Sequence, residues 1–364
     1  MRVFKFGGAS IKDAASVRNV LQILKRSDGE DLVVVISAIG KTTNRLEKLL
    51  EAHLKKEDTS EQFEAIRAEH VEIAAELMDG KSNTLIDEIN NTLVEVEWAL
   101  DEPDGLDEHF QYDQIVSIGE MLSTKIVSAY LNANGVLNVW VDARDMIRTD
   151  NCYQNARVQW EETEKLTKAV LERTRKKAPI VVTQGFIGGT SENFTTTLGR
   201  EGSDFTAAIL AYCTKADEVV IWKDVPGVLN ADPKYFEATE LIPHMSYHDA
   251  MELAYFGTSV IHPKTVKPLQ NADIPLRICS FVDPDEVGTV ISEKPTSKVV
   301  PSYIIKKNQT LVSIAPTDHS FVVEGHFKEI FSLLDELHIK GNAMQNSAVS
   351  FSFSTDSDNR KFEA

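Results

Sequence analysis

The sequence predicts an α/β protein built on a mostly parallel sheet, followed by a smaller domain. Short runs rich in β-branched residues alternate with longer amphipathic stretches, which is the pattern of a parallel sheet covered by helices. The chain has 364 residues, so two domains, or one large and one small, are expected. A hydrophobic content of 42%, a charged content of 26% and a mean hydropathy of -0.20 are typical of a globular protein.

Six short segments are the candidate strands of the sheet: residues 3–6, 32–37, 137–141, 180–184, 218–223 and 276–279. Helical patterns lie between them, and in residues 14–25 the apolar side chains line one helix face. Residues 43–100 carry no strand signal, and their apolar residues recur at helical spacing. We therefore expect a helical insertion there, whose charged run at residues 55–58 forms a solvated face.

The character of the sequence changes at residues 293–303, where two prolines lie among polar residues, and we predict a domain boundary there. Beyond it, residues 310–315 have the pattern of a strand, residues 325–337 of an amphipathic helix and residues 348–354 of a second strand. About 60 residues are few for a separately stable domain, so we expect this part to pack on a partner or to be incomplete.

Charge and cysteine content exclude several classes of protein. The chain carries 38 basic and 56 acidic residues, and its net charge of -18 disfavours nucleic acid, although a few positive groups in a cleft can still bind a nucleotide. Cys152, Cys213 and Cys279 form no CxxC pair, so neither a zinc site nor a disulfide framework is expected. No apolar run approaches the roughly 18 residues of a membrane span. We predict a cytoplasmic protein that binds no membrane.

Lys5, Gly7, Gly8 and Ser10 lie between the first predicted strand and the first predicted helix. Two glycines let a backbone approach a ligand, and the free amides of a helix N-terminus suit a phosphate. The arrangement matches neither the GxxxxGK[ST] nor the GxGxxG pattern, which argues against a P-loop or a dinucleotide fold. A tight turn from strand to helix explains the glycines equally well.

The small, hydroxylic loop of residues 37–44 follows the second predicted strand. Ligands of parallel sheets bind beyond the carboxyl ends of the strands, so this loop should face the same crevice as Gly7 and Gly8. N-capping of the next helix by Thr43 or Asn44 is an equal alternative.

Residues 197–206 are the most informative segment, because they combine two glycines, an arginine, an aspartate and hydroxyls ahead of an apolar helix. Arg200 offers a bidentate fork for a carboxylate. Ser203 or Asp204 could cap the helix, but a cap alone would not need Arg200, so the segment favours a ligand site.

Two further features of the sequence are weaker evidence for a ligand site or a metal site. Residues 221–228 leave a predicted strand into a Pro-Gly turn, which turn chemistry alone explains equally well. His244 and His248 are four residues apart and could share a helix face, but Pro243 and the lack of a third ligand favour surface or capping roles. His262 is expected to be a structural histidine at a helix start. No metal site is predicted.

Seven collinear segments resemble the aspartate kinases of the amino-acid kinase family: KFGGAS (5–10), VVVISAIGKTTN (33–44), SIGEMLS (117–123), TQGFIG (183–188), TTLGREGSD (196–204), IWKDVPGV (221–228) and YFGTSVIHP (255–263). The resemblance implies a three-layer αβα sandwich over residues 1–295 and a linker at 296–303. It also implies that residues 304–364 form part of an ACT domain, a ferredoxin-like α+β module with which the family senses lysine or threonine. A complete regulatory region would hold two such modules.

The resemblance implies transfer of the ATP γ-phosphoryl group to the side-chain carboxylate of L-aspartate, giving 4-phospho-L-aspartate. In the family, this step leads to lysine, threonine and methionine. ATP and Mg2+ are the implied cofactors, lysine or threonine the implied effector, and a homodimer the implied assembly. The protein's contribution would be positioning and charge neutralisation, because the attacking carboxylate is already ionised at neutral pH.

When the functional residues of the family are carried over position by position, the resemblance implies that Lys5 contacts the transferring phosphoryl group and that Asp204 orients Lys5. The aspartate side would consist of Arg200 on the α-carboxylate, Glu120 on the ammonium, and Ser37, Thr43 and Ser203 around them. The nucleotide side would consist of Lys5, Gly7, Gly8, Lys223, Asp224, Lys234 and Ser259.

Four residues depart from the family pattern, since Glu201, Lys223, Leu229 and Ser259 stand where Gly, Thr, Tyr and Lys are usual. Ser259 removes a positive charge from the phosphate site, and Lys223 is a candidate to supply it. Two alternatives remain: a family member acting on glutamate, N-acetylglutamate or a nucleotide, and a catalytically weak regulatory subunit that binds amino acids. The combination of Arg200 and Glu120 suits an unmodified amino acid and disfavours acylated or nucleotide acceptors.

Overall fold

The computed structural model describes residues 1–27, 29–102, 105–257, 260–294, 300–318 and 320–356. The chain divides into two compact units. The first comprises Met1–Ala254 and Ser259–Ser302, and the second comprises Tyr255–Thr258 and Tyr303–Ala364. The predicted linker at residues 296–303 lies largely outside the described residues, so its bounds stay a prediction.

An eight-stranded sheet forms the centre of the first unit, in the order β3-β4-β2-β1-β7-β9-β10-β8. Every neighbouring pair is parallel except β9 and β10, which run antiparallel. The bounds are β1 (Arg2–Phe6), β2 (Leu32–Ile36), β3 (Asn138–Val141), β4 (Ile180–Gln184), β7 (Glu218–Lys223), β8 (His244–Ser246), β9 (Leu276–Ser280) and β10 (Thr289–Ser292). All six predicted strands are present, whereas the sequence patterns missed β8 and β10.

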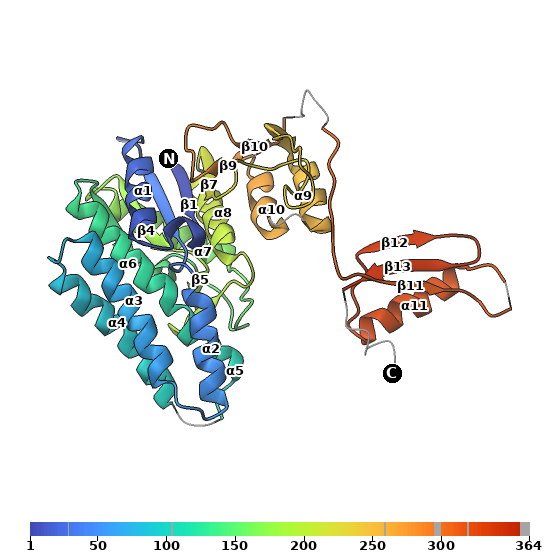
Figure 1. The fold of residues 1–364 in the computed structure, drawn as a ribbon, viewed down its shortest axis with the longest axis horizontal. Coiled ribbons are helices and arrows are strands. Elements are labelled where there is room, and N and C mark those ends of the chain that lie inside the picture. The colour runs from blue at the N-terminus through green and yellow to red at the C-terminus, as the bar shows by residue number, and fades with distance from the viewer. Residues whose placement is uncertain (28, 103–104, 258–259, 295–299, 319, 357–364) are drawn as a thin grey trace. The chain divides into compact units, whose positions relative to one another are not determined.

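Alternate residues of the central strands point to opposite faces of this sheet, and each face is buried under helices. Phe4 of β1 and Val34 of β2 join a core with the helices α1 (Ala14–Lys25), α3 (Ser60–Leu77), α4 (Asn83–Asp101) and α6 (Ile118–Ala133). Val3 and Val33 join a core with α7 (Trp160–Thr174), α8 (Gly202–Thr214) and α10 (Pro263–Asn271). The three-layer αβα sandwich implied by the resemblance is thereby confirmed (Figure 1).

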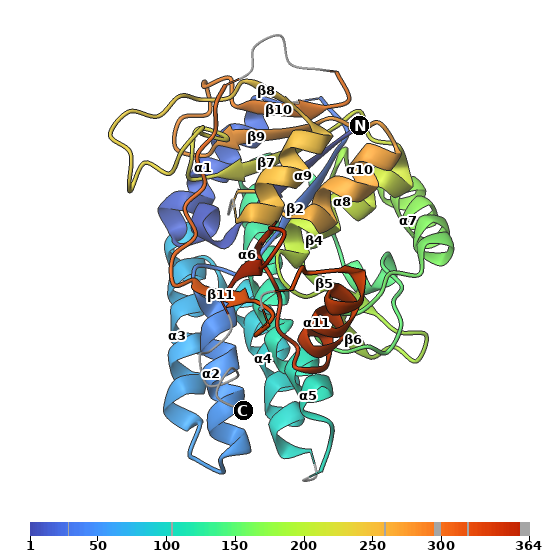
Figure 2. The same ribbon diagram turned by 90° about the vertical axis from the view of Figure 1, so that its right-hand side faces the viewer.

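The predicted helical insertion consists of α2 (Thr42–Leu54), α3 (Ser60–Leu77) and α4 (Asn83–Asp101). Two more helices follow directly, α5 (Glu108–Val116) and α6 (Ile118–Ala133). Figure 2 shows α2 to α5 extending as a bundle beyond the end of the sheet. A short antiparallel hairpin, β5 (Ile187–Gly189) and β6 (Thr195–Thr197), follows β4 and leads into the loop that carries Arg200. The sequence patterns did not reveal this hairpin.

The second unit has the element order β11 (Thr310–Ile314), α11 (Glu324–Glu336), β12 (Ala343–Asn346) and β13 (Phe351–Thr355), and it also takes the last two residues of α9 (Tyr247–Phe256). Its three strands form an antiparallel sheet in the order β11-β13-β12. Leu334 of α11 packs against Phe351 and Phe353, which alternate along β13. This is a βαββ arrangement, the first part of a ferredoxin-like α+β module.

Among the described residues, none of the helices combines the length and the apolar character needed to span a bilayer.

Candidate active site

A cavity of about 720 Å³ opens at the carboxyl ends of β1 and β2. Its walls include the end of β1, the loop that joins β2 to α2 and the first turns of α2, the start of α6, and the loop between β6 and α8. The parallel register places Phe6 opposite Ile36 and Trp222, so the loops after these strands emerge together. The predicted site residues that line the cavity are Lys5, Gly8, Ser37, Thr43, Glu120, Arg200 and Ser203.

Lys5, Asp204 and Lys223 form a buried ionic cluster beside this cavity. The Lys5 Nζ lies 2.6 Å from Asp204 Oδ1, and the Lys223 Nζ lies 3.2 Å from Asp204 Oδ2. Asp204 is only 1% exposed and Lys5 6%. Burial favours the neutral carboxyl, but the charges of the two lysines and their hydrogen bonds outweigh it and hold the pKa of Asp204 below its usual value. Two cations facing one carboxylate leave a net positive charge for an anion.

The backbone turn after β1 requires a glycine. A Cβ on Gly8 would lie 2.9 Å from the carbonyl oxygen of Gly40 and 3.0 Å from that of Ala38, so a side chain would force the two loops apart. A short 3₁₀ helix follows at Gly8–Ile11. Gly7 precedes it, and a Cβ there would lie 3.2 Å from the Lys5 Nζ.

The first helix has the predicted bounds, since α1 begins at Ala14. The expectation that the N-terminus of this helix offers free amides to a phosphate is wrong, because the side chain of Asp13 accepts from the amide of Ser16 at 2.7 Å. A carboxylate at this position competes with phosphate for the helix N-terminus.

Neither Thr43 nor Asn44 caps α2, which begins at Thr42 without a side-chain cap, and both residues line the cavity instead. Neither Ser203 nor Asp204 caps α8, which begins at Gly202 after the left-handed residue Glu201. Asp204 instead pairs with lysines from two strands.

Glu120, in the first turn of α6, is 3% exposed and lines the cavity. Its Oε1 accepts from the amide of Ala38 at 3.2 Å, while Oε2 has no hydrogen-bond partner among the described residues. Burial raises the pKa of Glu120 to about 8. An unsatisfied buried carboxylate oxygen is costly, so it favours a cationic ligand group at this point.

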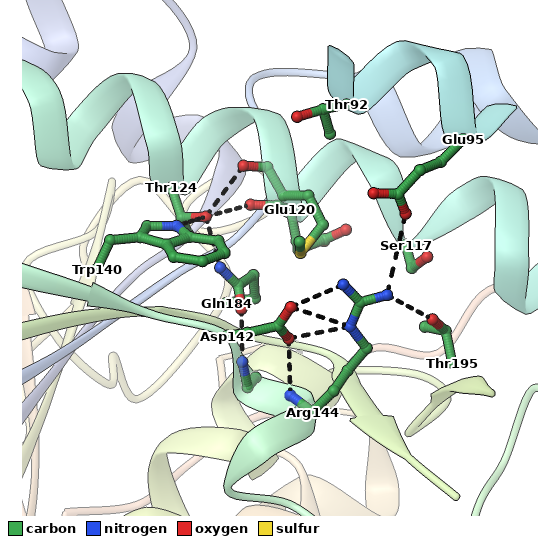
Figure 3. A network of polar contacts seen from close by, with 12 residues as sticks. Thr92, Glu95, Ser117, Glu120, Thr124, Trp140, Asp142, Arg144, Gln184 and Thr195 are labelled. Carbon is green, nitrogen blue, oxygen red and sulfur yellow. Dashed lines mark hydrogen bonds and ion pairs between the residues drawn. The ribbon is translucent and has the colours of Figure 1, made fainter. Parts of the chain in front are cut away.

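A polar network fixes the start of α6 against β3 and β4 (Figure 3). The hydroxyl of Thr124 donates to the carbonyl of Glu120 at 2.8 Å and accepts from the amide of Gln184 at 2.8 Å and the indole of Trp140 at 3.0 Å. In the same way the hydroxyl of Ser123 donates to the carbonyl of Ser37 at 2.6 Å. The backbone that carries Glu120 is therefore held to two strands and to the cavity loop.

Arg200 lies on an exposed loop whose backbone is unusual on both sides. Gly199 has a φ of 76° and Glu201 a φ of 54°, both in the left-handed region that favours glycine. The family's usual glycine at the second position suits this conformation, and Glu201 adopts it at a steric cost. Arg200 forms no ion pair with any described residue, so its guanidinium is free for a ligand carboxylate.

Asp113 on α5 organises this side of the cavity, and sequence reasoning missed it. The fully buried carboxylate accepts from the amide and hydroxyl of Thr197, at 2.8 Å and 2.6 Å, and from the amide of Gln154 at 3.0 Å. Burial raises its pKa to about 6 despite these donors. The carboxylate thus ties the strand before Arg200 to a residue of the cavity wall.

Gln154 and Phe186 also line the cavity and were missed. Their φ angles are 64° and 71°, which non-glycine residues rarely adopt. Nothing in a single sequence marks a non-glycine residue for such a conformation, so no local signal could have found them.

Fewer of the residues predicted to contact the nucleotide than of those predicted to contact aspartate line the cavity. Asp224 and Lys234 are exposed, and neither lines the cavity. Ser259 lies outside the described residues. Leu229 forms an isolated bridge with Leu241, and Glu201 is exposed at the cavity wall.

Of the three histidines considered in the sequence, His262 lies at a helix start, and His244 and His248 are exposed. The side chain of His262 accepts from the amide of Lys264 at 3.2 Å and caps α10, which confirms a histidine at a helix start. His244 lies in β8 and His248 in α9, so they do not share a helix face.

The parallel sheet, the glycine turn after β1 and the paired lysines define an α/β protein with an anion site at its strand ends. Residues 1–280 match the amino acid kinase family, and the chain belongs to that family. Its similar relatives include aspartokinases. It is 32% identical over 363 residues to the chloroplastic aspartokinase 2 of Arabidopsis thaliana, covering 97% of this chain and 66% of the relative. It is 32% identical to the lysine-sensitive aspartokinase 3 of Escherichia coli, covering 97% of this chain and 78% of the relative.

The chain is also similar to solved structures of aspartokinases. The chain is similar to E. coli aspartokinase III in complex with lysine and aspartate, with a TM-score of 0.84 and 30% identity over 98% of this chain and 79% of that chain. The complex of the same enzyme with aspartate and ADP gives a TM-score of 0.83 and 31% identity over the same shares. The chain spans 63% to 66% of the length of three chloroplastic aspartokinases that it matches.

Proposed function

We propose that this chain is an ATP-dependent kinase that phosphorylates the side-chain carboxylate of L-aspartate. The observation that supports the proposal most is the convergence of three groups on one cavity: the free guanidinium of Arg200, the unsatisfied carboxylate oxygen of Glu120 and the ammonium of Lys5. An unmodified amino acid with a second carboxylate presents one matching group to each. The similarity to aspartokinase III in complex with aspartate and ADP is consistent with it.

In the proposed complex Arg200 binds the α-carboxylate of aspartate and Glu120 binds its ammonium. The fork of the guanidinium makes two parallel hydrogen bonds to a carboxylate, which fixes the orientation of the substrate. Ser37, Thr43 and Ser203 supply hydrogen bonds around these groups. With the two groups on its Cα held in this way, the substrate directs its side-chain carboxylate toward Lys5.

Lys5 then neutralises charge on the phosphoryl group as it is transferred, and the turn at Gly7 and Gly8 admits the nucleotide phosphates. Both reactants are anions, so positioning and preorganised positive charge account for most of the catalysis. Asp204 fixes the position of the Lys5 ammonium. Asp224 and Lys234 stay proposed nucleotide contacts outside the cavity lining.

Mg2+ would supply further charge neutralisation on the phosphate oxygens. The described part of the chain holds no cluster of three or more histidine, cysteine or acidic side chains that could hold a metal ion. Such a site still suits Mg2+ when nucleotide is bound, because Mg2+ takes most of its ligands from phosphates and water.

Lys223 is proposed to supply the positive charge that the family usually places at the position of Ser259. We expect Lys223→Ala to raise KM for ATP and lower kcat/KM by about tenfold to a hundredfold, because one charge-assisted hydrogen bond to phosphate is lost. Lys223→Arg keeps the charge and should retain most of the activity. Steady-state kinetics with varied ATP measures both. Near-normal ATP turnover in Lys223→Ala would remove Lys223 from the site.

Asp113 is proposed to position the Arg200 loop. In Asp113→Asn an amide group faces donors that need acceptors, so at least one buried donor loses its partner. We expect KM for aspartate to rise about tenfold with a smaller change in kcat. Asp107→Ala, which removes the N-cap of the same helix, is the matched control: it should lose about 1 kcal/mol of stability and leave KM unchanged. Equal effects of both variants on KM would reduce Asp113 to a structural role.

The second unit is proposed to be part of an ACT domain that senses lysine or threonine, and the protein is proposed to be a homodimer. The similarity to aspartokinase III in complex with lysine favours lysine. The cytoplasmic location expected from the sequence stays a prediction, since three matched relatives are named chloroplastic.

A coupled assay of ADP release with the purified chain tests the proposed reaction. We expect turnover with L-aspartate and none with glutamate or N-acetylglutamate. The assay is run with and without added lysine and threonine, the two proposed effectors. Turnover with another acceptor would assign the chain to a different kinase of the family. Binding of aspartate without turnover would identify a regulatory subunit, the alternative that Ser259 and Leu229 favour.

A further inference from the structure

The first unit contains a second cavity, of about 470 Å³. The segment before α7, the start of α7, the outer face of α8 and the helix α10 form its walls. Its lining shares no residue with the cavity that contains Lys5 and Glu120. The proposed reaction makes no use of it.

Aromatic rings form one wall of this second cavity. Trp160 meets Tyr212 edge to face at a centroid distance of 5.1 Å and Phe205 at 6.3 Å. Trp160 remains 36% exposed in spite of these contacts. A partly exposed group of three rings offers a planar ligand both apolar area and the edge-to-face geometry that aromatic rings prefer.

Three cations line the same cavity, namely Arg157, Lys264 and Lys267, and no aspartate or glutamate does. None of the three forms an ion pair with a carboxylate in the described part of the chain. In a protein of net charge -18, such a local excess of positive charge favours an anionic occupant. Burial also lowers the pKa of Lys264, and a nearby anion would reverse that change.

Lys264 connects this cavity to the loop that carries Arg200. Its Nζ donates to the carbonyl of Leu198 at 3.4 Å and to the side chain of Asn155. The loop is tightly packed here, because a Cβ on Gly199 would lie 2.9 Å from Asn155 Oδ1 and 3.5 Å from the Lys264 Nζ. An anion that draws Lys264 toward the cavity would therefore withdraw a contact from the residue two positions before Arg200.

We propose that the second cavity binds a small anion with a planar ring, and that this ligand adjusts the Arg200 loop through Lys264. The anionic group pairs with Lys264, Lys267 and Arg157, and the ring packs on Trp160. The coupling to the Arg200 loop rests on the proposed function, whereas binding does not.

Phenyl phosphate serves as the probe, and its binding to the full chain is measured by calorimetric titration. Excess ADP is present to fill any nucleotide site. We expect saturable binding with one site per chain, and binding at least tenfold weaker for phenol and for inorganic phosphate. Lys267→Gln should weaken phenyl phosphate about tenfold, because one charge-assisted contact is lost. Lys165→Gln, an exposed lysine on α7, should leave the affinity unchanged. No saturable binding, or equal affinity in Lys267→Gln, overturns the site.

Tryptophan fluorescence locates the ligand. Binding should change the emission of the wild-type chain, which has four tryptophans, and the change should vanish in Trp160→Phe, which keeps a ring in the wall. A change that persists in Trp160→Phe overturns this location.

Kinetics test the coupling separately. Saturating phenyl phosphate should shift KM for aspartate at least threefold in the wild type, and in Lys267→Gln the same shift should need about tenfold more ligand. Binding with an unchanged KM overturns the coupling. A chain without kinase activity would refute the proposed function, while calorimetry would still decide the binding site.

Discussion

Lys5→Met should lower kcat by about a thousandfold, because it removes the preorganised positive charge on the transferring phosphoryl group. The methionine keeps the length and apolar stem of the side chain, so the walls of the cavity stay filled. Asp204 retains Lys223 as its partner, so the buried carboxylate is not left without a cation. The loss of activity should therefore exceed any loss of stability, which thermal unfolding measures on the same sample.

Lys25→Met is the matched control for this variant. Lys25 is an exposed residue in the last turn of α1, and its substitution should leave kcat unchanged. A Lys5→Met enzyme that unfolds normally and keeps kcat within threefold of the wild type would contradict the role of Lys5.

Glu120→Gln should raise KM for aspartate by about tenfold to a hundredfold and abolish its pH dependence. Burial raises the pKa of Glu120 to about 8 in the free protein, so below pH 8 the carboxyl is mostly protonated. The substrate ammonium binds the ionised form, and binding must then expel a proton. KM in the wild type should accordingly fall as pH rises from 6 to 8, by up to tenfold per pH unit.

Glu47→Gln provides the control for this pH profile. Glu47 lines the same cavity and accepts from the hydroxyl of Tyr112 at 2.7 Å, so its carboxylate already has a partner. The slope of KM against pH should survive in Glu47→Gln and be absent in Glu120→Gln. A slope that remains in Glu120→Gln would assign the titration to another group.

The strands and helices of the first unit were largely predictable, because their hydrophobic patterns report burial on one or two faces. The central strands are apolar on both faces, as in residues 32–36, and α1 shows a single apolar stripe. β8 and the hairpin of β5 and β6 were not predictable, since three-residue strands contain too few positions to show a period.

The sequence predicted those residues of the candidate site whose charged side chains would contact the substrates directly. Arg200, Glu120 and Lys5 came from the segments that resemble aspartate kinases, and all three line one cavity. Helix capping was wrong at Asp204, because a local pattern cannot reveal that a tertiary partner is stronger.

Asp113 could not have been found from the sequence. It looks like an ordinary acidic residue of a helix, and only the fold brings Thr197 and Gln154 to its carboxylate. Lys223 was named from the sequence as a candidate to supply the charge missing at Ser259, but its ion pair with Asp204 was not foreseen, because it depends on the pairing of β1 with β7.

A crystal structure of the chain with L-aspartate and ADP tests the central claim most directly. The account predicts one aspartate molecule in the 720 Å³ cavity, with its α-carboxylate about 3 Å from the Arg200 guanidinium and its ammonium about 3 Å from Glu120 Oε2. Its side-chain carboxylate should face the Lys5 ammonium. Aspartate bound outside this cavity, or with Arg200 and Lys5 in contact with separate ligands, would contradict the account.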